Sequence, residues 1–232
     1  MIYYGIILFF FGQTLGWFQL NLQSFSEYWK DKALLSSVLI DEIPYKQPII
    51  ILSADHLIEK TNKFNNEIKK NIKFLTSNNI FVFGIKPSTP SSLFGYFVTK
   101  KSNNQNRVIK FIEKPNTTKA KFIINRGGYW NSGMFFARKD SIINNFKKYQ
   151  KKMFKYSLSA VSSGEYKNKI YKLKKSAFIK NPSKSFDYAI LEKTNDINAI
   201  KLDMPWSDLG SWKEILLMFN KNKIKYLKKK NI

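Results

Sequence analysis

Four consecutive aliphatic residues, Ile49 to Leu52, constrain the fold of this chain more than any other segment. Pro48 precedes them and Ser53 follows, and a short β-branched run bounded in this way predicts a central strand of a parallel sheet. Apolar residues between 57 and 75 then recur near helical spacing, and residues 80–85 are strand-like again. This strand–helix–strand order predicts an α/β fold with a mainly parallel sheet.

Later segments predict further elements of the same two kinds. Strand-like runs occur at residues 108–112, 129–136 and 200–202. Helices are predicted from Asp140, over 187–193, and over 211–219 with Ile215, Leu216 and Phe219 facing inward. The lysine-rich residues 146–180 are the least regular, and we expect them to form peripheral helices.

The charge and the rare residue types exclude several kinds of site. The chain has no cysteine, and its one histidine, His56, cannot build a multi-histidine metal site. A formal net charge of +24 invites a nucleic-acid interpretation, but only three basic residues are arginines, which make most bidentate base contacts. The lysines are spread along the sequence, so we expect no nucleic-acid partner and a diffuse field that attracts anionic substrates.

The amino-terminal segment is largely apolar. Residues 1–26 carry no charged side chain, so a membrane anchor is one interpretation. Gly5, Gly12 and Gly16 interrupt the apolar run, and no basic segment precedes it as a signal peptide requires. A buried first strand from Tyr4 to Phe11 is the simpler prediction, and we expect a cytoplasmic protein.

Taken one at a time, the polar residues that follow these strands are open to ordinary explanations. Asp55 comes directly after the first strand and would serve equally as a helix N-cap. Asp208 precedes a glycine and would suit a turn. Glu113 and Lys114 would form a solvated charge pair, and Asn131 a buried amide.

Taken in order, six segments resemble those of a known enzyme family. They are PIIILSADHLI, FVFGIKPSTPSSLFGYF, VIKFIEKP, GGYWNSGMFF, SFDYAILEK and PWSDLGSW, and they extend from Pro48 to about Phe219. This order resembles the sugar-1-phosphate nucleotidyltransferases, and the WNSGMF and SFDYAILEK segments resemble the mannose-1-phosphate guanylyltransferases among them. The resemblance implies a three-layer α/β/α nucleotidyltransferase fold (Rossmann-like, GT-A-like) in a single domain over residues 1–232.

The resemblance also implies a reaction and a set of site residues. GTP and mannose 1-phosphate would react with Mg²⁺ to give GDP-mannose and pyrophosphate, and both substrates are anions that need positioning and charge neutralisation. Asp55 and Asp208 would be the catalytic carboxylates that hold the metal. Lys114 would meet the sugar phosphate as a catalytic cation. Residues implied to bind or support the sugar are Gly95, Glu113, Asn131, Gly133, Asp187 and Glu192.

Residues 1–47 depart from the family pattern. Residues 48–220, by contrast, contain the motifs implied to bind the sugar phosphate and the metal. The family has a glycine-rich loop of the form GGxGTRLWPxSR that cradles the triphosphate. Phe10 and Phe11 stand in place of its paired glycines, and Leu15 in place of its first arginine. Several dozen family residues before Pro48 have no counterpart, which predicts an incomplete sheet and a shortened, degraded nucleotide-binding part.

The sequence is therefore compatible with two functions. One is nucleotidyl transfer, and the other is a non-catalytic protein that binds sugar phosphate or regulates the enzyme. In the second case the chain would form an oligomer with further copies of itself or with an intact relative.

Overall fold

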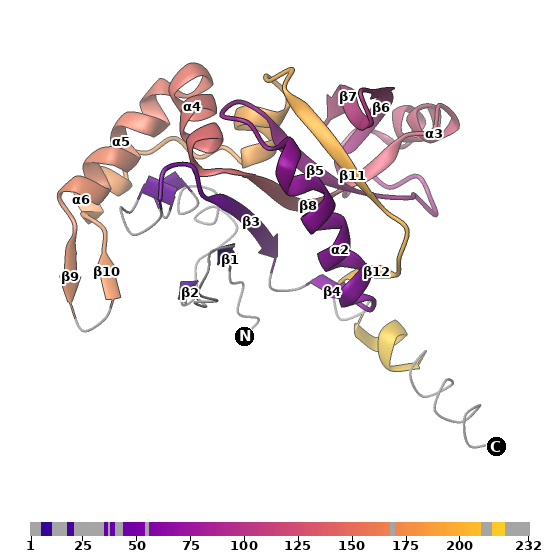
Figure 1. Cartoon of the computed structure of the whole chain (residues 1–232), viewed down its shortest axis with the longest axis horizontal. Coiled ribbons are helices and arrows are strands. Elements are labelled where there is room, and N and C mark those ends of the chain that lie inside the picture. The colour runs from indigo at the N-terminus through magenta and orange to yellow at the C-terminus, as the bar shows by residue number, and fades with distance from the viewer. Residues whose placement is uncertain are drawn as a thin grey trace.

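The apolar runs of the sequence form one central β-sheet (Figure 1). The computed structural model describes residues 6–10, 18–20, 35–36, 38–39, 44–53, 56–167, 170–209 and 215–220. Within them, eight strands form this sheet in the order β2-β1-β3-β8-β5-β11-β7-β6. Their bounds are Ile6–Phe10 (β1), Phe18–Leu20 (β2), Pro48–Ser53 (β3), Ile80–Ile85 (β5), Tyr96–Ser102 (β6), Gln105–Ile112 (β7), Tyr129–Arg138 (β8) and Ile197–Leu202 (β11).

Helices and two small strand pairs surround this sheet. The strand pairs are β4 (His56–Ile58) with β12 (Trp206–Asp208), and β9 (Glu165–Lys167) with β10 (Ile170–Lys172). The helices are α2 (Thr61–Asn71), η1 (Ile72–Phe74), α3 (Thr117–Asn125), α4 (Lys139–Tyr149), α5 (Lys151–Ser162), α6 (Lys175–Phe178) and η2 (Asp187–Leu191). Residues 215–220 are also helical. None of the helices in the described ranges is long and apolar enough to cross a bilayer.

The α/β fold class is confirmed, but the prediction of a mainly parallel sheet is wrong. Among the described pairs only β5 and β11 run parallel, and every other neighbouring pair is antiparallel. β8 lies between β3 and β5 and is antiparallel to both, so β3 and β5 share one direction without being neighbours. Hydrophobic runs show that a strand is buried on both faces, which does not determine the direction of its neighbours.

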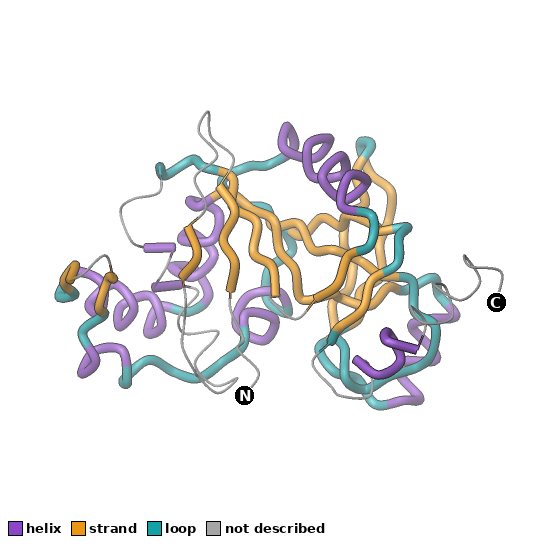
Figure 2. Tube along the Cα trace, turned by 90° about the horizontal axis from the view of Figure 1, so that it is seen from below, coloured by secondary structure: helices purple, strands orange, loops and turns teal. Residues whose placement is uncertain are grey.

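Alternate residues of the central strands enter two separate hydrophobic cores, one on each face of the sheet. In β3, Ile49 and Ile51 lie in one core and Ile50 lies in the other, as a side-chain period of two requires. Helix α2 contributes Phe64 and Ile68 to the core that contains Ile50. Figure 2 shows helices on both sides of the strands, so the three-layer arrangement is present.

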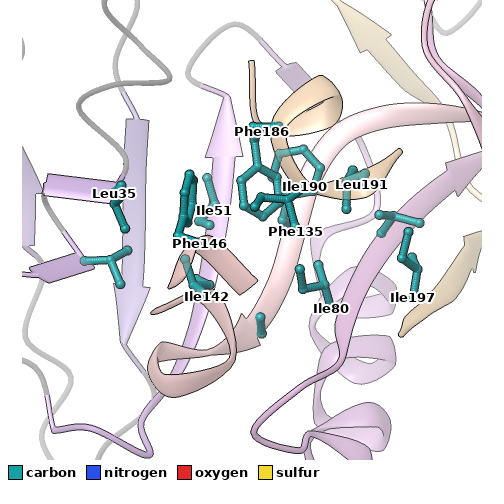
Figure 3. Packing of buried hydrophobic residues seen from close by; sticks show 14 of the residues in the cluster. Leu35, Ile51, Ile80, Phe135, Ile142, Phe146, Phe186, Ile190, Leu191 and Ile197 are labelled. Carbon is teal, nitrogen blue, oxygen red and sulfur yellow. The ribbon is translucent and has the colours of Figure 1, made fainter. Parts of the chain in front are cut away.

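Helices α4 and η2 cover the other face of the sheet. Phe186, directly before η2, packs against Phe135 of β8 and Phe146 of α4, with ring centroids 4.8 Å and 5.9 Å apart (Figure 3). Leu35, from the short helical stretch before β3, belongs to the same core and is fully buried. This packing fixes η2 against β8, which positions the polar residues of both segments.

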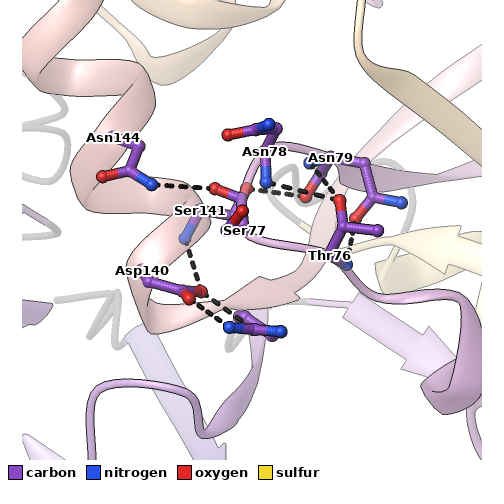
Figure 4. A network of polar contacts seen from close by, with 8 residues as sticks. Thr76, Ser77, Asn78, Asn79, Asp140, Ser141 and Asn144 are labelled. Carbon is purple, nitrogen blue, oxygen red and sulfur yellow. Dashed lines mark hydrogen bonds and ion pairs between the residues drawn. The ribbon is translucent and has the colours of Figure 1, made fainter.

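A polar network fixes the turn before β5 to the start of α4 (Figure 4). Ser141 Oγ donates to the carbonyl of Asn79 at 2.7 Å, and Asn144 Nδ2 donates to the carbonyl of Ser77 at 3.0 Å. The buried carboxylate of Asp140 accepts from Arg138 Nε at 2.9 Å and from the backbone N–H of Ser141 at 2.9 Å. An anion in the first turn also suits the dipole of α4.

Most of the predicted helices and strands are found at the predicted residues. The predicted strand at 80–85 is β5, and the predicted helix over 57–75 is α2 with η1, although residues 57 and 58 belong to β4. The predicted first strand is present as β1. The prediction that Leu216 and Phe219 face inward is wrong, since these side chains are 59% and 61% exposed. An apolar face indicates a helix but does not provide the element that would cover it.

Candidate functional site

The candidate site begins where the start of β6 meets the start of β8. Tyr96 of β6 pairs with Trp130 of β8, and the backbone N–H of Asn131 donates to the carbonyl of Gly95 at 2.8 Å. Asn131 also pairs with Gly84, one residue before the end of β5. Two of the predicted residues, Gly95 and Asn131, therefore lie side by side although 36 positions separate them in the sequence.

Glu113 lies against Gly95 at the end of the β6–β7 ladder, where Tyr96 pairs with Ile112. The Glu113 side chain is only 8% exposed. A Cβ atom on Gly95 would overlap the Glu113 carboxylate and would lie 3.4 Å from the Cβ of Asn131. The absence of a side chain at position 95 is thus what leaves room there for the Glu113 carboxylate.

Asn131 is buried and is held from two directions. Its Nδ2 donates to Asp187 Oδ1 at 2.8 Å, and its Oδ1 accepts from the backbone N–H of Gly133 at 3.4 Å. Gly133 has a φ of 74°, in the left-handed region that glycine adopts without steric cost. Asp187 is the first residue of η2, where a carboxylate suits the helix dipole.

Glu192 and Lys114 also contact Glu113. Glu192 Oε1 accepts from the backbone N–H of Glu113 at 3.0 Å. Lys114 Nζ lies 4.0 Å from Glu113 Oε1, and its side chain is 56% exposed. The backbone of Lys114 has a φ of 44°. A lysine with this φ is strained, and Pro115, which follows it, restricts the backbone of Lys114 further. Such outliers cluster at functional sites.

Asp208 lies on the small β4–β12 pair, directly opposite His56. The ring of His56 meets that of Trp206 edge to face at 5.1 Å. A Cβ on Gly133 would lie 3.9 Å from His56 Cε1, so β4 adjoins the part of β8 that carries Asn131. Asp55 precedes His56 in the sequence but lies outside the described residues.

Aromatic side chains connect the β4–β12 pair to the remainder of the site. Phe94, directly before Gly95, has its ring centroid 4.9 Å from that of Trp130 and 5.9 Å from that of Trp206. Trp130 Nε1 donates to the hydroxyl of Tyr96 at 2.8 Å. Sequence reasoning missed Phe94, Trp130 and Trp206 as positioning residues. The available signal was that each directly adjoins or lies within two positions of a predicted site residue.

The type of donor atom at the site determines which metal ion it would bind. In the described part of the chain, no group of three or more His, Asp or Glu side chains could hold a metal ion. Asp208 with its sequence-predicted partner Asp55 would supply two carboxylates. Mg²⁺ is commonly bound through one or two carboxylates, with water and substrate phosphates as its other ligands, so this donor set fits it in kind.

A polar pocket of about 250 Å³ lies elsewhere in the structure. It is bounded by the β6–β7 turn and the starts of β5 and β11, and its lining includes Asn79, Asn103, Arg107 and Asn198. None of the nine predicted site residues lines it. The candidate site is therefore defined by contacts between the predicted residues, and this pocket is separate from it.

The sheet is covered on both faces, and polar residues gather at the ends of β6, β7 and β8. This arrangement is typical of an α/β enzyme fold. The sequence profile of the family described as nucleotidyl transferase matches residues 32–223, and the chain belongs to this family. The resemblance to mannose-1-phosphate guanylyltransferases found in the six segments is confirmed by the relatives below.

The xanthan biosynthesis protein XanB of Xanthomonas campestris pv. campestris is 32% identical over 169 residues, covering 72% of this chain and 36% of the relative. A mannose-1-phosphate guanylyltransferase of Escherichia coli is 31% identical over 180 residues, covering 74% of this chain and 39% of the relative. The chain thus spans little more than a third of the length of these curated relatives.

A solved structure supports the same fold. A crystal structure from Thermus thermophilus, titled mannose-1-phosphate geranyltransferase, superposes with a TM-score of 0.69 at 20% identity. The superposition covers 79% of this chain and 52% of that chain. At this identity the likeness concerns the fold alone.

Proposed function

We propose that this chain carries the sugar-phosphate side of a mannose-1-phosphate guanylyltransferase, which makes GDP-mannose and pyrophosphate from GTP and mannose 1-phosphate. One observation carries the proposal: Glu113 and Asn131 both lie against Gly95, with Asp187 hydrogen-bonded to Asn131 and Glu192 hydrogen-bonded to Glu113. The name of the Escherichia coli relative supports the choice of sugar and nucleotide.

The proposed roles follow from the chemistry of these side chains. Lys114 presents an exposed ammonium beside Glu113, and we assign it to the sugar phosphate as a point charge. Glu113 accepts hydrogen bonds from sugar hydroxyls, while Gly95, Asn131 and Gly133 form the wall of the sugar pocket. Asp187 and Glu192 support this wall, because each accepts a hydrogen bond from a pocket residue.

The reaction itself is an in-line substitution at phosphorus. An oxygen of the sugar phosphate attacks the α-phosphorus of GTP, the bond from that phosphorus to the bridging oxygen breaks, and pyrophosphate leaves with the electron pair. Positioning of the two anions and neutralisation of their charge supply most of the catalysis. Asp55 and Asp208 would hold Mg²⁺, which when bound neutralises charge on the phosphates.

A second candidate function is binding of sugar phosphate without turnover. The substitutions in the glycine-rich loop favour it, because Phe10 and Phe11 would occupy space that the phosphates need and Leu15 removes a charged contact. In this case residues 48–220 keep the sugar-phosphate side, and residues 1–47 have lost nucleotide handling. The chain would then act in the cytoplasm as a subunit with further copies of itself or with an intact relative.

Thermal unfolding with and without ligands separates the two candidates. A ligand that binds the native state at about a hundred times its Kd stabilises by about 2.7 kcal/mol, which raises Tm by about 5–11 °C for a chain of this size. Stabilisation by magnesium with mannose 1-phosphate is expected under both proposals. Stabilisation by magnesium with GTP, followed by pyrophosphate release when both substrates are present, is expected only for the enzyme.

Matched variants identify the site in this assay. Lys114→Ala should abolish the stabilisation by mannose 1-phosphate, whereas Lys110→Ala, an exposed lysine on β7, should preserve it. Asp208→Asn should remove the magnesium dependence of the stabilisation. If mannose 1-phosphate stabilises neither the wild type nor any variant, both candidates are refuted for this chain.

A further inference from the structure

One part of the molecule concentrates the positive charge that the sequence suggested was diffuse. Residues 147–184 contain twelve lysines, no arginine and one acidic residue, Glu165, so they carry eleven of the chain's 24 net positive charges. We call this segment the lysine lobe. It comprises the end of α4 together with α5, β9, β10 and α6, which Figures 1 and 2 place at one end of the molecule. The candidate site includes residues on or next to β6, β7 and β12, which lie away from this end of the molecule (Figure 1).

The exposed lysines of helix α5 lie on one face of the helix. Lys151, Lys152, Lys155 and Leu158 are exposed, and at 3.6 residues per turn they fall within about a third of the helix circumference. Leu158 is 44% exposed. The opposite face is buried in the protein through Met153, Ser157, Ala160 and Val161.

The segment that follows α5 is fixed along this helix. Tyr171 donates from its hydroxyl to the carbonyl of Val161 at 2.6 Å, and the backbone N–H of Lys174 donates to the carbonyl of Ala160 at 3.0 Å. Asn181 Nδ2 donates to Ser157 Oγ at 2.7 Å. This segment adds an aliphatic side chain, Ile179, that is 51% exposed, and four exposed lysines: Lys172, Lys174, Lys175 and Lys180.

Among the described residues, no ion pair neutralises a lysine of the lobe. The ion pairs of the described residues involve Lys63, Lys70, Arg107, Lys114 and Arg138, all outside the lobe. Like charges so close together repel one another, and the repulsion is relieved when an anionic surface lies against them.

We propose that the lysine lobe binds the surface of an anionic lipid bilayer, with the exposed face of α5 toward the headgroups. Clusters of four to eight lysines suffice for such attraction, and exposed aliphatic side chains among them add contact with the interfacial region. Nucleic acid is the less favoured partner, because the lobe has no arginine for bidentate contacts and the exposed large apolar side chains in its described part are aliphatic. This proposal does not depend on the proposed enzymatic function.

Vesicle sedimentation of the full chain tests the proposal. The protein should sediment with vesicles of phosphatidylcholine mixed with phosphatidylglycerol and not with phosphatidylcholine alone. Binding should fall steeply between about 0.05 and 0.5 M salt, because the screening length shortens from roughly 14 Å to roughly 4 Å. This salt dependence is measured on the wild type and therefore needs no variant to fold.

Charge-matched variants locate the surface. Each lysine near an anionic surface contributes about a fivefold factor in affinity, so K151Q/K152Q/K155Q should weaken binding about a hundredfold. The control K69Q/K110Q/K121Q removes the same charge at three exposed positions outside the lobe, and it should retain binding within a few-fold. Leu158→Gln should weaken binding severalfold with the charge unchanged.

Three outcomes would overturn the proposal. The first is the absence of sedimentation with anionic vesicles at low salt, and the second is equal weakening by both triple variants. The third is tighter binding of the lobe to a single- or double-stranded oligonucleotide than to vesicles at the same salt, which would assign the surface to nucleic acid. Circular dichroism and Tm of each variant establish that the comparison is between folded proteins.

Discussion

Replacing Gly95 with alanine tests the packing on which the candidate site depends. Gly95 is buried and its φ lies outside the left-handed region, so alanine is compatible with the backbone. The added Cβ would overlap the Glu113 carboxylate and approach the Cβ of Asn131 to 3.4 Å. Any loss of stability in G95A is therefore expected to come mainly from the overlap with the Glu113 carboxylate.

The overlap falls on the far end of the Glu113 side chain, so rotation of that side chain relieves part of it. The backbone N–H of Glu113 is bonded to Glu192 at 3.0 Å, so the carboxylate can move away only by rotating its side chain. Overpacking of a buried position costs about 1–3 kcal/mol, and an off-rotamer side chain about 0.5–1.5 kcal/mol. Because the Glu113 side chain can rotate, we expect a loss of about 1 kcal/mol, which lowers Tm by about 2–4 °C for a chain of this length.

A double-mutant cycle assigns this loss to Glu113. In E113A the carboxylate is gone, so adding G95A to that background should cost less than about 0.5 kcal/mol, and the coupling energy should be about 0.5–1 kcal/mol. Urea unfolding followed by circular dichroism supplies the four free energies. If G95A costs the same in both backgrounds, Glu113 does not lie against position 95 and the site described above is misassembled.

Three further substitutions have defined outcomes. Asp187→Ala removes the charged acceptor of Asn131 Nδ2 and should cost about 1.5–3 kcal/mol in urea unfolding, whereas a loss under about 0.5 kcal/mol would contradict the contact. Lys114→Gly should be about 1 kcal/mol more stable than Lys114→Ala, because the left-handed φ of 44° costs glycine nothing; equal stability would contradict the strain. Asp140→Ala leaves Arg138, 22% exposed, without its buried partner and should cost about 3 kcal/mol, while an unchanged Tm would refute that ion pair.

The positions of the central strands could be predicted from sequence, but their directions could not. Runs such as Ile49 to Leu52 and Ile80 to Ile85 are apolar because both faces of these strands are covered, and that is a local property of the sequence. The placement of β8 between β3 and β5 depends on contacts between residues 45 to 90 positions apart, which no local pattern encodes. The β4–β12 pair was missed because two three-residue strands are too short to show a period of two.

The sequence named residues that lie close together in the structure, but it did not predict the contacts between them. The motif resemblance identified Gly95, Glu113 and Asn131, which the structure brings together. It gave no indication that Glu192 would bind the backbone of Glu113, because backbone hydrogen bonds leave no signature in residue types. The role of Phe94 between two tryptophans was likewise invisible, since an aromatic residue beside a glycine is also common in ordinary cores.

The π-helical geometry of η2 explains how one short element supports two parts of the site. Asp187 holds Asn131 and Glu192 holds the backbone of Glu113, although the two carboxylates are five positions apart. In an α-helix of 3.6 residues per turn, positions five apart point in clearly different directions. In η2 the backbone N–H of Glu192 donates to the carbonyl of Asp187 at 2.9 Å, the i to i+5 bond of a π-turn, so the two residues lie nearly one above the other. The widened turn thus directs both carboxylates toward the same region, and an α-helical turn in its place would leave one of them without its present partner.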